Sequence, residues 1–192
     1  MMAARRTPEK PAEGGLLLLD ACCLINLYGT GHIEDVLEIL PYSVATSERV
    51  ADCEVLTIRG TVQPDGSTER VTLSPRSLET AGHLSILPVA SEQEIDELAR
   101  FAANLDDGEA SVCALAVVHG GGVATDDRRA LRILSHTQVP VVQTPELLFA
   151  WAQRSQASGA VVRDALRAIN DRARFYPRKD APCFHWWAGH FK

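Results

Sequence analysis

Carboxylate side chains recur in this chain where strands are expected to end or helices to begin, which is where sites form in α/β proteins. These acids are Asp20, Glu54, Glu109, Asp126 and Asp127. Gathered in one place they would repel one another, and a bound cation would relieve that repulsion. Hard divalent cations with oxygen ligands, chiefly Mg²⁺ or Mn²⁺, suit such a cluster. The acids therefore predict a binding site for a divalent metal ion.

Each acid near a helix start also has a structural alternative. Asp20 follows the run Leu16–Leu19 and is equally suited to capping the next helix. Asp106 and Glu109 have the spacing of a capping box, and both acids favour the dipole of the helix that they open. Thr125 can likewise cap the helix that follows it, with Asp126 and Asp127 in the first turn of that helix. The hypothesis of a metal site rests on the acids jointly.

Glu54 is more informative than the other acids, because the pattern places it on an apolar face. At about 100° per residue, the expected helix over residues 47–58 has an apolar stripe of Val50, Cys53, Thr57 and Ile58. Glu54 lies within that stripe, and a buried carboxylate needs a cation, a metal or a proton. A buried pair with an arginine, or a different phase of the helix, is the alternative explanation.

The elements that position these acids alternate between strands and helices. Strands are expected over 16–19, 84–89, 123–124 and 139–142, helices over 33–40, 47–58, 91–103, 108–119, 126–136, 145–154 and 161–174, and a hairpin over 59–74. Such alternation predicts an α/β protein, a three-layer α/β/α sandwich with a mostly parallel central sheet. We expect a flexible leader over 1–14, one domain over 15–155 and a C-terminal helix with an aromatic and basic tail over 156–192.

Composition is that of a globular protein without a membrane span. The 192 residues are 46% hydrophobic and 23% charged, and no apolar run approaches the roughly 20 residues of a span. No secretory leader is apparent, so a cytoplasmic location is expected. The five cysteines form no C-x-x-C pair and are expected to be reduced, mostly in the core. The net charge is −6, yet residues 160–192 carry seven Lys/Arg against three Asp/Glu, which suits a phosphate-contacting surface or a solvated tail.

Four segments in order resemble the PIN-domain nucleases, over residues 16–150. They are L-L-L-L-D-A-C-C-L-I-N-L, E-R-V-A-D-C-E-V, D-D-G-E-A-S-V-C-A-L-A and G-V-A-T-D-D-R-R-A-L. The resemblance implies that Asp20, Glu54, Glu109 and either Asp127 or Asp126 bind the metal. The family is best known for toxins of bacterial toxin–antitoxin pairs that cut RNA with Mg²⁺ or Mn²⁺. This chain departs from the family in Cys22, where a polar residue is common, and in the hairpin inserted after Glu54.

The resemblance also implies a division of roles in phosphodiester hydrolysis. Asp20 is the expected central ligand, with Glu54, Glu109 and Asp127 as its catalytic partners. The substrate-binding residues are expected to be Thr125, Arg128, Arg129 and Arg132, although the arginines also suit a solvated helix face. A homodimer and an antitoxin partner follow from the toxin resemblance. The alternative is a non-catalytic protein-interaction module of the same fold.

Overall fold

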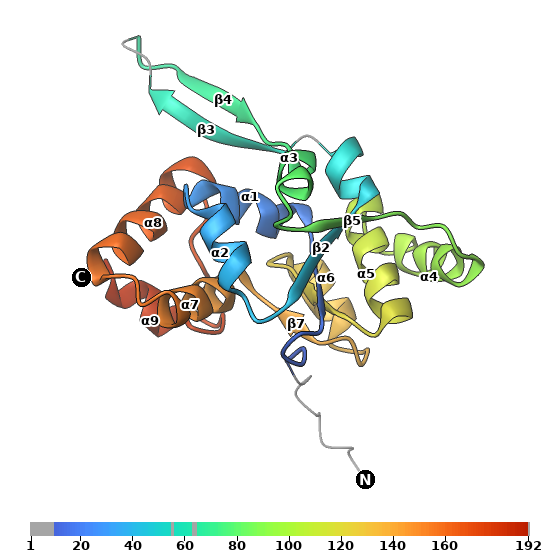
Figure 1. Ribbon diagram of the computed structural model, residues 1–192. Coiled ribbons are helices and arrows are strands. Elements are labelled where there is room, and N and C mark those ends of the chain that lie inside the picture. Colours follow the sequence, from blue (N-terminus) through green and yellow to red (C-terminus); the bar gives the residue numbers. More distant parts are fainter. Residues whose placement is uncertain (1–9, 55, 63–64, 192) are drawn as a thin grey trace.

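A five-stranded parallel sheet, in the order β5-β2-β1-β6-β7, forms the centre of the protein in a computed structural model that describes residues 10–54, 56–62 and 65–191 (Figure 1). Most of the expected leader over 1–14 lies outside the described residues. The strands are β1 Leu16–Leu19, β2 Ser43–Ser47, β5 Ser85–Leu87, β6 Gly122–Ala124 and β7 Val141–Val142. Central β1 pairs with β2 on one side and β6 on the other, with Leu18 opposite Ala45 and Val123. A continuous apolar run suits such a strand because helices cover both of its faces.

Helices flank the sheet on two sides, which confirms the predicted α/β fold class. On one side lie α1 Ala21–Gly29, α2 Ile33–Ile39, α7 Thr144–Arg154, α8 Gly159–Arg172 and α9 Phe184–Gly189, and on the other lie α4 Glu92–Ala102 and α5 Asp107–His119 (Figure 1). The shorter α3 Pro75–Thr80 and α6 Arg128–Leu134 complete the helices of the described residues. Within those residues, no helix combines the length and the apolar character needed to cross a membrane.

The expected helix over residues 47–58 is wrong. Ser47 is the last residue of β2 and pairs with Leu87, and only a short π-helical turn, η1 Arg49–Cys53, follows it. Strand β3 Thr57–Val62 then begins two residues before the expected hairpin and pairs with β4 Thr68–Thr72. The β-branched Thr57 and Ile58 lie opposite Thr72 and Val71, a cross-strand packing that favours strand over helix.

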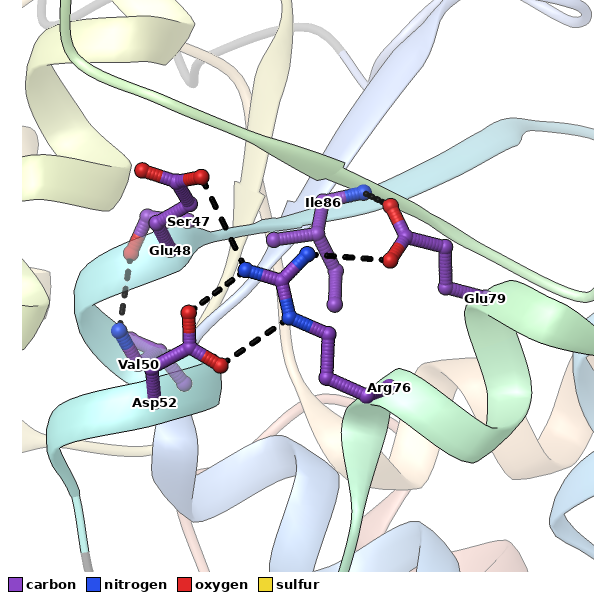
Figure 2. Close-up of polar contacts among 7 residues, drawn as sticks. All are labelled: Ser47, Glu48, Val50, Asp52, Arg76, Glu79 and Ile86. Atoms are coloured by element: carbon purple, nitrogen blue, oxygen red, sulfur yellow. Dashed lines mark hydrogen bonds and ion pairs between the residues drawn. The ribbon is translucent and has the colours of Figure 1, made fainter.

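An ion-pair network holds η1 against its neighbours (Figure 2). Arg76 of α3 binds Asp52 of η1 through two nitrogens, at 3.0 and 2.5 Å, and also contacts Glu79 and Glu48. Glu79 in turn accepts a hydrogen bond from the Ile86 amide of β5 at 3.2 Å. These side chains are largely exposed, so the network contributes little stability, but its bidentate geometry fixes the orientation of the turn that precedes Glu54.

The C-terminal helices pack into the same core. Val162, Ala165, Leu166 and Ile169 of α8 are buried, and α8 lies directly against α1. A Cβ on Gly29 at the end of α1 would come within 3.3 Å of the Ile169 Cα and 3.1 Å of the Ala173 Cβ, so a larger residue would need α8 to shift by a few tenths of an ångström. Trp187 of α9 is fully buried and packs edge-on against Phe175.

Candidate metal centre

Asp20 lies at the carboxyl end of β1, and its side chain caps α1 as expected. Its Oδ1 accepts a hydrogen bond from the Cys23 amide at 2.8 Å, and the Cys22 thiol donates to both carboxylate oxygens at 3.0 and 3.1 Å. Only 3% of its surface is exposed. Burial raises the pKa of Asp20 to about 6, the nearby charge of Asp126 adds to the rise, and the hydrogen bonds from Cys22 and Cys23 oppose it.

Glu54 follows η1 in an extended conformation and turns its carboxylate onto the first turn of α5. A Cβ built on Gly108 would lie 1.6 Å from Glu54 Oε1, so the carboxylate occupies the space that the missing side chain leaves. Burial raises the pKa of Glu54, and the charges of Asp106 and Asp20 add to the rise. Arg49 opposes it, although Arg49 also pairs with Asp107.

Glu109 lies in the first turn of α5, where one of the two hydrogen bonds of the predicted capping box is present. Its amide donates to Asp106 Oδ1 at 2.9 Å, which makes Asp106 the cap of the helix. Burial raises the pKa of the Glu109 carboxyl to about 7, and the charges of Asp106, Asp127 and Asp20 contribute. The side chain of Glu109 therefore faces three other acids and is not simply part of a solvated helix start.

Asp126 and Asp127 border the acidic centre in different ways. Asp126 accepts hydrogen bonds from the Thr144 amide and hydroxyl and from Asn26 at 3.0 Å, and burial raises its pKa despite these bonds. Asp127 caps α6, where its Oδ1 accepts from the amides of Arg129 and Ala130. The charge of Asp126 helps to raise the pKa of Asp20, and the charge of Asp127 helps to raise the pKa of Glu109. Both aspartates therefore remain candidate ligands of the metal.

The predicted substrate-binding residues lie beside these acids. Thr125 is buried, and its hydroxyl accepts a hydrogen bond from the Asp127 amide at 3.1 Å, so it shapes the turn between β6 and α6. Arg128 and Arg129 lie in the first turn of α6 and Arg132 lies in its last turn, and all three are exposed. Within the described part of the chain none of these three arginines has an ion-pair partner, so their charge faces solvent.

The carboxylate oxygens are ligands that suit a hard divalent cation, but among the described residues only Asp20, Cys22 and Cys23 bring three ligand atoms within 4.8 Å of one another. Asp20, Glu54 and Glu109 have raised pKa values, and each is raised in part by another acid of the group. A cation at this edge of the sheet would offset the repulsion among the carboxylates. Carboxylate oxygens are also the ligands that Mg²⁺ and Mn²⁺ prefer. We name these residues, with Asp106, Asp126 and Asp127, the acidic centre.

Several residues of the site were not among the predicted site residues. Asp106 was expected only as a helix cap, yet its charge reaches both Glu54 and Glu109. Asn26 and Thr144 hold Asp126, and the only signal for Asn26 was a polar residue inside an apolar run. Cys22 is half-buried beside Asp20, and the expectation that most of the cysteines lie in the core is wrong, since only Cys23 and Cys113 are buried. All five cysteines are free, as expected from their spacing.

The fold and the acidic centre define an α/β protein with an acidic site at the carboxyl edge of its sheet. A model of the family described as the PIN domain matches residues 16–181, and the chain belongs to this family. PIN domains are generally metal-dependent nucleases. The match includes α8 and extends beyond the segments in which the sequence resemblance is evident. No curated protein and no solved structure matches the chain.

Proposed function

We propose that this PIN domain is a Mg²⁺- or Mn²⁺-dependent endoribonuclease that hydrolyses RNA phosphodiester bonds. The observation that supports it most strongly is that burial raises the pKa values of Asp20, Glu54 and Glu109, three acids from separate elements, and that the charge of Asp20 adds to the rise at both glutamates. A partly buried anionic cluster of this kind is costly unless a cation occupies it. The acidic centre is therefore built for a bound metal rather than for stability.

The side chains of the acidic centre have distinct roles in this proposal. Asp20 is the central ligand, because it is the most buried of the acids and its carboxylate is held by Cys22 and Cys23. Glu109, Glu54 and Asp127 complete the ligand set, directly or through water. A divalent cation bound there supplies Lewis acidity and a water of lowered pKa.

Two groups of arginines are available for the RNA backbone. Arg128, Arg129 and Arg132 adjoin the acidic centre on α6. A second group lies in a cleft between the β3–β4 hairpin and the end of α8, lined by Arg59, Arg172 and Arg174 with Asn170 and Asp171. Helix α1 connects the two places, since it begins at Asp20 and packs against α8 at its end. We propose that the cleft holds the backbone of an RNA strand whose cleaved bond lies at the acidic centre.

The proposed activity is tested by incubating the purified protein with unstructured RNA and following its cleavage with and without a chelator. We expect cleavage with Mg²⁺ or Mn²⁺ and none after the cation is removed. The same cations should raise the melting temperature, because a ligand at about 100 times its Kd stabilises the folded state by about 2.7 kcal/mol. A cation-independent melting temperature and intact RNA would favour the non-catalytic interaction module.

The role of the cleft is tested by neutralising two of its arginines. Arg59→Gln/Arg174→Gln should weaken RNA binding and lower the slope of log affinity against log salt by about 1.4, since each phosphate contact to single strands contributes about 0.7. Arg163→Gln/Arg167→Gln, with the same charge change on the exposed part of α8, is the matched control. An equal loss of slope in both variants would show that the arginines act only through net charge.

The toxin role, the antitoxin partner, the homodimer and the cytoplasmic location are finer proposals that follow from the family resemblance. Induced expression should arrest bacterial growth if the protein is a toxin. Co-expression of the protein encoded by the adjacent gene should then restore growth. Growth arrest by a cleavage-deficient variant would separate toxicity from RNA hydrolysis.

A further inference from the structure

Two adjacent cysteines place soft ligands inside an otherwise oxygen-rich site. One donor atom from each of Asp20, Cys22 and Cys23 lies within 4.8 Å of the other two. The Cys22 sulfur is 3.0 and 3.1 Å from the two Asp20 oxygens, and the Cys23 sulfur is 3.5 Å from Asp126 Oδ2. The pair therefore lies between the two acids that follow β1 and β6, and we name Asp20, Cys22 and Cys23 the thiol trio.

The spacing of the thiol trio is close to that of a tetrahedral site. With Zn–S bonds of about 2.3 Å and Zn–O bonds of about 2.0–2.2 Å, neighbouring ligand atoms around zinc are roughly 3.6–3.8 Å apart. The sulfur-to-oxygen distances of Cys22 fall about half an ångström below this range, so the two groups must move apart by about that much to admit the ion. Cys23 is fully buried and Cys22 only half-buried, so the trio is closed on its inner side and open toward solvent.

Polar groups lie against both sulfurs. The Asp126 amide donates a hydrogen bond to the Cys22 sulfur at 3.2 Å, and the Thr144 hydroxyl, whose single proton goes to Asp126, lies 3.4 Å from the Cys23 sulfur. A donor such as the Asp126 amide stabilises the negative charge of a thiolate ligand and orients it. The two groups come from the segment after β6 and from α7 rather than from α1 itself.

From this geometry we propose that the thiol trio binds a thiolate-seeking divalent cation of the zinc class, and that this cation competes with the catalytic metal for Asp20. Thiolates favour Zn²⁺ and Co²⁺ strongly over Mg²⁺, which prefers oxygen. On binding, each S–H bond gives its proton to solvent and a metal–sulfur bond replaces it. Because Asp20 is shared, an ion in the trio removes the central ligand of the acidic centre. This inhibitory effect rests on the proposed ribonuclease function, whereas the binding site does not.

Cobalt provides a direct test of the site, because sulfur-to-cobalt charge transfer absorbs in the near ultraviolet and oxygen-only sites lack this band. Titrating the reduced wild-type protein with Co²⁺ should produce the band with one ion per chain, and Zn²⁺ should abolish it. Cys22→Ser should lower the affinity for Co²⁺ at least about tenfold, since even outer partners of a metal site are worth about 10–100-fold. Cys53→Ser and Cys183→Ser, outside the trio, should bind like wild type.

Two results would overturn the thiol site. One is the absence of a charge-transfer band in the wild-type protein, and the other is an unchanged band in both Cys22→Ser and Cys23→Ser when circular dichroism shows that they are folded. RNA cleavage distinguishes a failure of the thiol site from a failure of the proposed function. Mg²⁺-dependent cleavage without a charge-transfer band would refute only the proposed thiol site. A charge-transfer band without any cleavage would refute only the proposed ribonuclease function. If both proposals hold, Zn²⁺ inhibits wild-type cleavage by a larger factor than cleavage by Cys22→Ser.

Discussion

Replacing Asp20 by asparagine is expected to lower Mg²⁺-dependent RNA cleavage by at least about 10²–10³-fold, the scale of losing one preorganised electrostatic group. The substitution keeps the shape of the side chain and an oxygen that can accept from the Cys23 amide, so the cap of α1 survives. It removes a negative charge that the cation needs. Affinity for the metal should therefore fall together with cleavage.

The same substitution should make the metal-free protein more stable at neutral pH. The pKa of Asp20 is raised by burial from 3.8 to about 6 in the folded protein, so the charged form is disfavoured there relative to the unfolded chain. Well below pH 3.8 the carboxyl is protonated in both the folded and the unfolded protein, so Asp20 costs no folding stability. The loss of stability grows as the pH rises and is complete above about pH 6. Its size at pH 7 is about 3 kcal/mol, because each pKa unit corresponds to about 1.4 kcal/mol.

Cleavage assays and denaturant unfolding at about pH 4 and pH 7 check both parts of this prediction. The Asp20→Asn protein should be more stable than wild type at neutral pH and only slightly more stable in acid. Saturating Mg²⁺ should reduce this difference in the free energy of unfolding, because it stabilises only the wild type. Asp96→Asn, the same charge change at an exposed position of α4, should alter neither quantity. Mg²⁺-dependent cleavage at the wild-type rate by the Asp20→Asn protein would refute the central role of this residue.

Gly108→Ala is expected to lower cleavage by about 10²-fold without unfolding the protein. The new methyl group would overlap Glu54 Oε1, and the end of a flexible side chain moves more readily than the helix does. Glu54 would leave the acidic centre, and a displacement of about 1 Å at a reacting site costs as much as this. Alanine favours the helix over glycine by up to about 1 kcal/mol, which offsets the tight contact with Val50.

The matched control is Gly159→Ala at the start of α8, where a Cβ meets open space. It should leave cleavage unchanged, and both variants should keep free energies of unfolding within about 1 kcal/mol of wild type. Glu54→Gln should show a loss of cleavage similar to that of Gly108→Ala. Full activity of Gly108→Ala would mean that the position of Glu54 over α5 has no part in the reaction.

The sequence predicts elements well where one short segment contains the whole signal. The four leucines of β1 indicate a buried parallel strand, and the structure has one. Ser91 and Glu94 predict a capping box, and both of its hydrogen bonds are present at the start of α4. Asp106 also caps α5 as expected, through the Glu109 amide.

Signals that depend on distant segments could not be found in this way. Asn26 contacts Asp126 across 100 residues of sequence, and no local pattern connects them. Glu54 was expected to face inward, but from a regular helix; the pairing of Thr57 and Ile58 with β4 replaces that helix by a short turn. The space above Gly108 that receives Glu54 exists only once η1 and α5 are packed together. The assignment of the individual metal ligands stays a prediction.

The close approach of α1 and α8 has a consequence for how the chain folds during its synthesis on the ribosome. The acids up to Asp127 emerge early, but the helix that packs against Gly29 and steadies α1 comes only with residues 159–173. A nascent chain that has synthesised every acid still lacks the surface that anchors the helix carrying Cys22 and Cys23. Contacts that span so much sequence form late and slowly. The acidic residues are therefore synthesised before the helix that completes their arrangement.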